Sequence, residues 1–359
     1  MNFEQVVPVK EIEPTLTKIL GEMQGKNKTR ACLFNLLIYT KENTREKYIQ
    51  QVMQKIVFRF PCRILLFIDK GSAPMAIRST VSVIEINSGE TPIFCDCIQF
   101  EMSTLDLNQI TYLTLPHLMP DLPTYMLWAE DPFKQDPLPY QLEKFCSRVI
   151  FDSEVADQLV IFAKTLLRFQ VRTNLTLSDL NWARVESFRD LLIQLFFSKK
   201  QANNPPTAIE ITYNDRDSPF FCHHKIQAIY LGIDLALRFK MQFEKVDEEA
   251  LIFKREQQLC KITLKPSTHD TVTAGRILSL SIDLPEDEHY HLKRKESNPS
   301  IVVIYRTEKT FCEIPSEYLL AAEDSGASLT DEIFHPETSQ HFLAIQNFIA
   351  HQPLDNFCI

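Results

Sequence analysis

The chain has 359 residues, an apolar fraction of 45% and a net charge of −9, values typical of a globular protein large enough for two domains. Its seven glycines are few, and it contains no dinucleotide fingerprint, P-loop, nucleophile elbow or His-Glu-x-x-His motif. We therefore expect neither a cofactor nor a catalytic metal. With one short basic cluster, at residues 291–296, we expect no nucleic-acid binding. The chain shows no signal peptide and no apolar run of membrane-spanning length, so we expect a cytoplasmic protein.

The N-terminal half is predicted to alternate strands and helices. A buried strand over residues 29–40, a helix over 43–60 capped by Asn43, and a strand over 62–69 form a βαβ unit, which implies a parallel strand pair. Other helices are expected at residues 13–24 and 153–169, and other strands at residues 77–86, 91–102, 124–131 and 147–154. This order predicts a mixed, partly parallel sheet with flanking helices.

The C-terminal half favours an α+β domain with a mainly antiparallel sheet. Helices are predicted at residues 184–197, 223–240 and 339–350, and strands at residues 208–213, 250–256, 259–266, 276–284, 289–295, 300–307 and 309–315. We place the domains at residues 1–173 and 174–359. The polar, Pro-containing stretch at 198–207 is the alternative boundary.

Acidic residues follow several apolar strands: Asp69, Glu130, Asp131, Asp152, Glu154, Asp215 and Asp217. Ligands bind beyond the carboxyl ends of strands in open parallel sheets, so these acids are candidates for acid–base chemistry or oxygen ligation. The alternative is that they lie where strands meet water, and that Asp152 or Ser153 caps the helix beginning near Val155.

Residues 115–133 contain four prolines and one of the two tryptophans, Trp128. Each proline fixes φ and restricts the preceding residue to extended conformations, so the segment is predicted to be stiff. Asp121 lies between two X-Pro bonds and suits a turn. We expect Trp128 to be buried and the segment to present the end of the 124–131 strand.

Two further groups of side chains are candidates for function. Trp182 precedes Arg184 and Arg189, and the two arginines are candidates to bind a carboxylate or another anion on a partner; the alternative is that Trp182 packs into the core and the arginines are solvated. Nine cysteines without a Cys-x-x-Cys motif favour reduced thiols; the redox candidates are Cys62, Cys95 and Cys97.

Five motifs, in this order, resemble the OpcA family of glucose-6-phosphate dehydrogenase assembly proteins: TRACLFNLLIY, FPCRILLF, LMPDLPTYMLWAEDPF, SRVIFDS and DLNWARVESFRDLL. They cover residues 29–192. Three positions depart from the family pattern, namely Phe60 for its usual His, Ala129 for a second Trp, and Phe188 for a Trp. These departures weigh against essential chemistry at those side chains.

The resemblance implies a non-catalytic assembly factor or allosteric activator that binds glucose-6-phosphate dehydrogenase and supports the oxidative pentose phosphate pathway. Its partner contacts are then expected among Asp121, Trp128, Glu130, Asp131, Trp182, Arg184 and Arg189. Two alternatives stay open. One is a sugar-phosphate sensor or enzyme that uses the acidic strand ends with Arg184 and Arg189, and the other is a thiol-controlled adaptor.

Overall fold

The structure, a computed structural model, describes residues 3–24, 29–42, 45–86, 93–134, 136–197, 204–219, 223–248, 250–295, 300–306, 316–319, 335, 337–354 and 357. The chain divides into two compact units. The N-terminal unit comprises Met1–Asp152, Arg168–Leu180 and Ser325–Thr338, and the C-terminal unit comprises Ser153–Leu167, Asn181–Asp324 and Ser339–Ile359. The boundaries expected at residue 173 and within 198–207 stay predictions.

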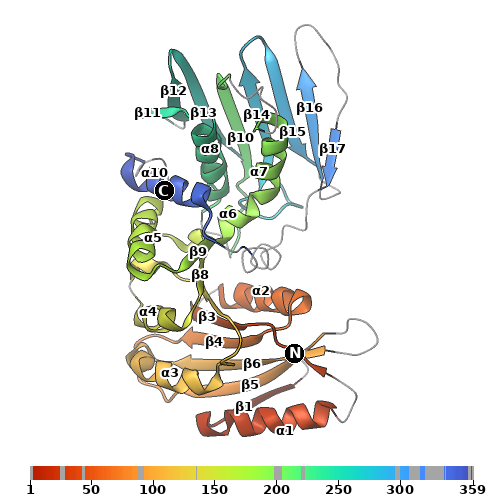
Figure 1. Cartoon of the computed structure of the whole chain (residues 1–359), viewed down its shortest axis with the longest axis vertical. Coiled ribbons are helices and arrows are strands. Elements are labelled where there is room, and N and C mark those ends of the chain that lie inside the picture. The colour runs from red at the N-terminus through yellow and green to blue at the C-terminus, as the bar shows by residue number, and fades with distance from the viewer. Residues whose placement is uncertain are drawn as a thin grey trace. The chain divides into compact units, whose positions relative to one another are not determined.

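A nine-stranded sheet forms the N-terminal unit (Figure 1). Its strands are β1 (Phe3–Val7), β2 (Thr29–Arg30), β3 (Asn35–Lys41), β4 (Arg63–Asp69), β5 (Arg78–Ile86), β6 (Ile93–Met102), β7 (Thr124–Trp128), β8 (Arg148–Phe151) and β9 (Thr176–Asp179). The spatial order is β1-β5-β6-β4-β3-β7-β8-β9, with β2 beside β6. The expected βαβ unit is confirmed, because β3 and β4 pair in parallel and α2 joins them.

Apart from the short β2, which pairs in parallel with β6, six of these strands form one continuous parallel series: β6, β4, β3, β7, β8 and β9. Numbered along the chain, their spatial order is 3-2-1-4-5-6, which is the order of the doubly wound dinucleotide-binding fold. The order reverses between β3 and β7. In such sheets a ligand binds beyond the carboxyl ends of the strands at this switch point, so the residues that follow β3 and β7 define the first place to look for a site.

The α-helices described in the first 173 residues are α1 (Ile12–Gln24), α2 (Arg45–Arg59), α3 (Leu107–Thr114), α4 (Pro137–Leu142) and α5 (Leu159–Thr173), and α5 is divided between the two units. The buried side chains of α2 recur at helical spacing, from Tyr48 to Val57, and pack toward β3 and β5. The helix expected to begin at residue 153 begins at Leu159 instead. Ser153–Val155 is a short 3-10 turn, so the expected cap by Asp152 or Ser153 is wrong.

The C-terminal unit contains an eight-stranded sheet in the order β11-β12-β13-β10-β14-β15-β16-β17 (Figure 1). Its strands are β10 (Ala208–Asn214), β11 (Gln242–Asp247), β12 (Ala250–Arg255), β13 (Gln258–Ser267), β14 (Ile277–Leu284), β15 (Glu288–Arg294), β16 (Ser300–Arg306) and β17 (Ser316–Leu319). Every neighbouring pair is antiparallel except β10 and β13. The expected mainly antiparallel sheet is therefore confirmed.

The helices named in this half are α6 (Leu180–Arg184), α7 (Glu186–Leu192), α8 (Ile226–Arg238) and α10 (Gln340–His351), and a π-helical turn, Ile193–Phe197, continues α7. The long apolar helix α8 packs on β10 and β13, and α10 packs on α8. Two expectations concern residues outside the described ranges, namely the strand at 309–315 and the cap at Asn43.

Candidate functional site

The acids that follow the parallel strands of the N-terminal unit are buried. Their exposed fractions are 2% for Asp69, 7% for Glu130, 2% for Asp131 and 1% for Asp152. The expectation that these acids lie where strands meet water is therefore wrong here. Carboxylates this deeply buried need hydrogen bonds or opposite charges, and the structure supplies both.

Glu130 occupies the switch point between β3 and β7. Its Oε1 accepts hydrogen bonds from the backbone N–H of Lys41, at 2.8 Å, and from the hydroxyl of Thr40, at 3.2 Å. Both donors belong to the carboxyl end of β3. The backbone N–H of Lys41, at the place where this fold usually binds a ligand, is therefore already hydrogen-bonded to a carboxylate of the chain itself.

The side chain of Lys41 forms an ion pair, between its Nζ and Asp136 Oδ1 at 2.7 Å. Burial lowers the pKa of Lys41, but the hydrogen bond and charge of Asp136 outweigh burial, so the pKa is raised and the ammonium stays charged. Asp69 accepts the hydroxyl of Tyr39 at 3.3 Å, and burial together with the surrounding carboxylates raises the pKa of that tyrosine. Lys41 and Asp136 thus neutralise each other's charge, and a hydrogen bond joins Tyr39 to Asp69.

Asp131 and Asp152 also have internal roles. Asp131 Oδ1 accepts the backbone N–H of Phe133 at 2.9 Å and so fixes the turn after β7. Asp152 Oδ2 pairs with Arg45 of α2 at 2.6 Å. The acids at this edge are therefore structural anchors of the loops and helices that follow the strands.

The proline-rich segment is held by the buried side chain of Asn35, at the start of β3. Asn35 Nδ2 donates to the carbonyls of Met119 and Leu122 at 3.0 and 3.3 Å, and Oδ1 accepts the N–H of Met119 at 2.9 Å. Asp121 lies exposed in the turn that these bonds fix. The segment is thus tied to the start of β3, and the predicted stiffness stays a prediction.

Trp128 is fully buried, as expected. Its ring centroid lies 5.0 Å from that of Tyr140 in an edge-on contact and 5.7 Å from that of Phe151. With no exposed surface, Trp128 cannot touch a partner directly, and its placement among the partner-contact candidates is corrected to a core role.

The three candidates after residue 180 do not form one anion site. Trp182 is 2% exposed, and the guanidinium of Arg189 lies over its ring, 3.5 Å from the centroid. Arg184 is 3% exposed and donates to Oδ1 of the buried Asn181 at 2.9 Å. Asn181 in turn donates to Ser153 and Glu154, so Arg184 belongs to a buried network.

The three redox candidates are buried. Burial raises the pKa of Cys62 well above its ordinary value, and it raises the pKa of Cys95 and of Cys97 to about 12. A reactive thiol needs a lowered pKa and exposure, so these features disfavour a redox role. Among the residues that the structure describes, no three His, Cys, Asp or Glu side chains gather as a metal site, and no described helix is long and apolar enough to cross a membrane.

An exposed apolar surface lies on and beside α3, and the sequence analysis did not single it out. Leu105, Tyr112 and Leu115 are 65%, 78% and 39% exposed. Their spacing of seven and three residues puts them on one side of the helical segment. We call these three residues the α3 surface. Exposed apolar clusters of this kind mark interaction sites.

Comparison with solved structures defines the class of the chain. The fold is shared with a 3-ketoreductase from Actinomadura kijaniata, solved with TDP-benzene and NADP, at a TM-score of 0.50 and 9% identity over 88% of this chain and 94% of that one. At this identity the likeness concerns the fold alone. The chain is thus built as a dinucleotide-binding-type unit and a second, sheet-based unit.

Sequence comparisons match part of the chain to one family. Residues 53–166 match the glucose-6-phosphate dehydrogenase subunit N-terminal domain of the OpcA family. A protein of Nostoc punctiforme with the provisional name OxPP cycle protein OpcA is 27% identical over 156 residues, 42% of this chain and 33% of that protein. Its namesake in Synechococcus elongatus is 29% identical over 142 residues, 38% of this chain and 31% of that protein. The matches confirm the resemblance to the OpcA family and span about a third of these relatives.

Proposed function

We propose that the chain is a non-catalytic partner of glucose-6-phosphate dehydrogenase that supports the oxidative pentose phosphate pathway. The matched family is described as a subunit domain of that enzyme, and the two relatives carry names that place them in the oxidative pentose phosphate cycle. The proposal brings these descriptions to this chain through the segment that they share, residues 53–166.

The observation that carries the non-catalytic part of the proposal is that Glu130 occupies the switch point between β3 and β7. A dinucleotide in this fold places its negatively charged pyrophosphate against backbone N–H groups at a glycine-rich turn after the first strand. Here the N–H of Lys41 binds Glu130, and the connection to α2 is Glu-Asn-Thr, without glycine. The Glu130 carboxylate is already bonded to this N–H group, and its negative charge repels a phosphate. In our proposal the fold therefore serves as a scaffold and not as a dinucleotide-binding site.

The α3 surface is the part of the matched segment that we assign to partner contact. Leu105, Tyr112 and Leu115 all lie within residues 53–166, and the turn with Asp121 follows them in the chain. A tyrosine that is 78% exposed between two leucines has the character of an interface hot spot. We assign Asp121 to the polar rim of this contact.

An activator acts by binding one state of its target more tightly than another. We propose that this chain binds the active oligomer of the dehydrogenase preferentially. Light scattering of the mixed, purified proteins should show a complex, and enzyme assays should show a lower apparent KM or a shifted oligomer distribution. Unchanged mass and unchanged kinetics at micromolar concentrations would refute the proposal.

The alternatives from the sequence lose their candidate residues. Five of the acidic strand ends, namely Asp69, Glu130, Asp131, Asp152 and Glu154, are buried, and so is Arg184, which donates to Asn181. Arg189 lies on Trp182. Asp215 and Asp217 are exposed. A sugar-phosphate site built from the buried acids with Arg184 and Arg189 therefore has no support. The thiol-controlled adaptor would need Cys62, Cys95 or Cys97 to react, against their burial and raised pKa values.

A further inference from the structure

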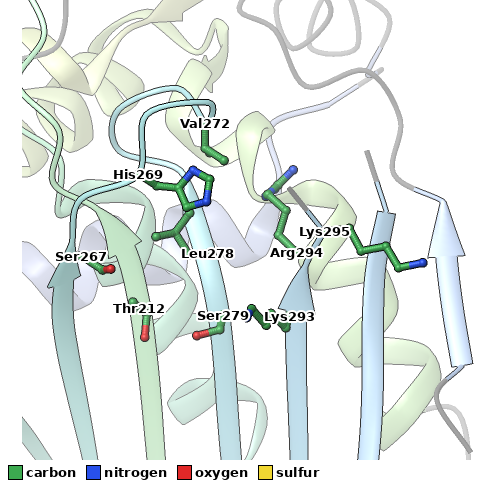
Figure 2. Close-up of a pocket in the computed structure, with 9 residues that line it drawn as sticks. All are labelled: Thr212, Ser267, His269, Val272, Leu278, Ser279, Lys293, Arg294 and Lys295. Carbon is green, nitrogen blue, oxygen red and sulfur yellow. The ribbon is translucent and has the colours of Figure 1, made fainter. Parts of the chain in front are cut away.

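A basic pocket lies in the C-terminal unit, at the end of its sheet (Figure 2). It has a volume of about 200 Å³. The ends of β10, β13, β14 and β15 and the loop that follows β13 line the pocket. The lining residues are Thr212, Ser267, His269, Val272, Leu278, Ser279, Lys293, Arg294 and Lys295. Figure 2 shows His269 and Val272 on this loop, beyond the ends of the strands that carry Thr212 and Ser279.

The charge of the pocket has one sign. Three consecutive cations at the end of β15 line it, and the nine described lining residues include no carboxylate. Lys295 pairs with Glu317 at 2.6 Å. Arg294 donates its Nε to the carbonyl of Ile277 at 3.1 Å, which orients its guanidinium. Within the described part of the chain, Lys293 makes no ion pair, so its ammonium is available to an anion from solution.

The other lining groups suit an oxyanion. Thr212, Ser267 and Ser279 bring hydroxyls that can donate hydrogen bonds, and His269 adds a ring nitrogen. Thr212 and Ser279 face each other across the pairing of β10 and β14, one strand away from Lys293, which pairs with Ser279. Hydroxyl donors beside an ammonium form the usual combination for phosphate recognition.

The loop over the pocket is fixed before any ligand arrives. Asn214, fully buried at the end of β10, donates its Nδ2 to the carbonyls of His269 and Val272 at 2.9 and 2.7 Å, and its Oδ1 accepts the N–H of His269 at 2.9 Å. The loop closes at Gly275, whose φ of +75° favours glycine. A held loop reduces the entropy lost on binding.

We propose that this pocket binds a small phosphate-bearing anion, either inorganic phosphate or the phosphate group of a small metabolite. The volume is below the roughly 300–1,000 Å³ usual for pockets of drug-sized ligands, which favours a small anion. Lys293 supplies the charge, and Thr212 and Ser279 donate to the phosphate oxygens. The inference concerns the C-terminal unit and does not rest on the proposed partnership with the dehydrogenase.

Isothermal titration of the isolated full chain tests the proposal. Inorganic phosphate, a hexose monophosphate and the unphosphorylated hexose are titrated at constant ionic strength. We expect saturable binding of at least one phosphorylated probe, none of the hexose, and weaker binding as salt is added. Tighter binding of the hexose monophosphate than of inorganic phosphate would identify a metabolite as the ligand class, and the reverse would identify free phosphate.

Substitutions locate the binding. Lys293→Gln should weaken it about tenfold, as loss of a charge-assisted hydrogen bond does, and Lys293→Glu should abolish it. Lys261→Gln is the matched control, an exposed lysine on β13 of the same sheet that does not line the pocket. No saturable binding by the unmodified chain at millimolar probe, or equal weakening by Lys293→Gln and Lys261→Gln, would overturn the proposal.

Discussion

At the scale of single residues, three buried asparagines each hold a loop or a group of side chains in place through hydrogen bonds. Asn35 fixes the proline-rich turn, Asn214 fixes the loop over the basic pocket, and Asn181 joins Ser153, Glu154, Arg184 and Gln227. Each is fully buried. A lone asparagine in an apolar run is a sequence signal for this role, because a buried amide must satisfy both its donors and its acceptor. The partners, up to 89 residues away for Asn35, cannot be predicted from the sequence.

Asn35→Leu tests this role. The substitution leaves the N–H of Met119 and the carbonyls of Met119 and Leu122 without their side-chain partner, and unpaired buried polar groups cost about 1–3 kcal/mol. Chemical denaturation should show an unfolding free energy lower by that amount. The exposed Asn204→Leu is the control and should change stability little. Equal effects of the two substitutions would show that Asn35 does not hold the turn.

The thiols make a second prediction at this scale. With a pKa of about 12 for Cys95 and Cys97, the thiolate fraction at pH 8 is about a thousandfold below that of a free cysteine. Iodoacetamide should therefore label these two residues and Cys62 very slowly in the folded protein and rapidly in denaturant, as followed by peptide mass spectrometry. Rapid labelling of any of the three in the folded state would restore the thiol-controlled adaptor.

At the scale of elements, local sequence patterns predicted most of the helices and strands that the structure contains. The apolar runs of β3 and β4 and the helical spacing of α2 are local signals, and the βαβ unit followed from them. Among the described strands, four escaped prediction, including β17, which begins after the strand expected at residues 309–315. β1 and β9 are short, and β11 has a largely exposed, polar sequence, QFEKVD, that owes its strand form to pairing with β12.

Helix α1 depends on a pair of contacts that should respond to acid. Glu13 Oε1 lies 2.7 Å from His117 Nδ1 and also pairs with Arg63. Burial raises the pKa of Glu13, but the hydrogen bond to His117 and the charge of Arg63 outweigh it, so the pKa lies below its ordinary 4.5. The ionised carboxylate therefore stabilises the folded state above the unfolded pKa, and this contribution is lost as the pH falls through the folded pKa.

Glu13→Gln should consequently lower the melting temperature at neutral pH, and the difference from the unmodified chain should shrink as the pH falls below the ordinary pKa of 4.5 and through the lowered pKa of the folded state. Because the Glu13 side chain is 43% exposed, we expect less than about 1 kcal/mol. Glu22→Gln, an exposed acid on the same helix, is the control and should show no such pH dependence. A difference that does not change with pH would contradict the role assigned to the Glu13 carboxylate.

At the scale of the whole molecule, the sequence predicted a partly parallel sheet and a mainly antiparallel sheet but not the strand order of either. The 3-2-1-4-5-6 order arises from pairings between distant strands, as does the contact of Arg45 with Asp152, 107 residues away. Conversely, the missing glycine motifs already excluded the usual cofactor sites, and the structure gives the physical counterpart, since Glu130 binds the donor at the switch point. The hydrogen bond of Glu130 at the switch point is the observation on which the proposed partner role rests.

The most direct test of that role is a binding titration of the chain against purified glucose-6-phosphate dehydrogenase, with enzyme activity followed in the same samples. The unmodified chain should bind saturably and raise activity at low substrate. Tyr112→Ala should weaken binding by tenfold or more, as loss of an aromatic hot spot does, whereas Phe58→Ala, 70% exposed on α2, should not. No binding by the unmodified chain would contradict the partnership itself, and equal binding by Tyr112→Ala and Phe58→Ala would contradict its assignment to the α3 surface.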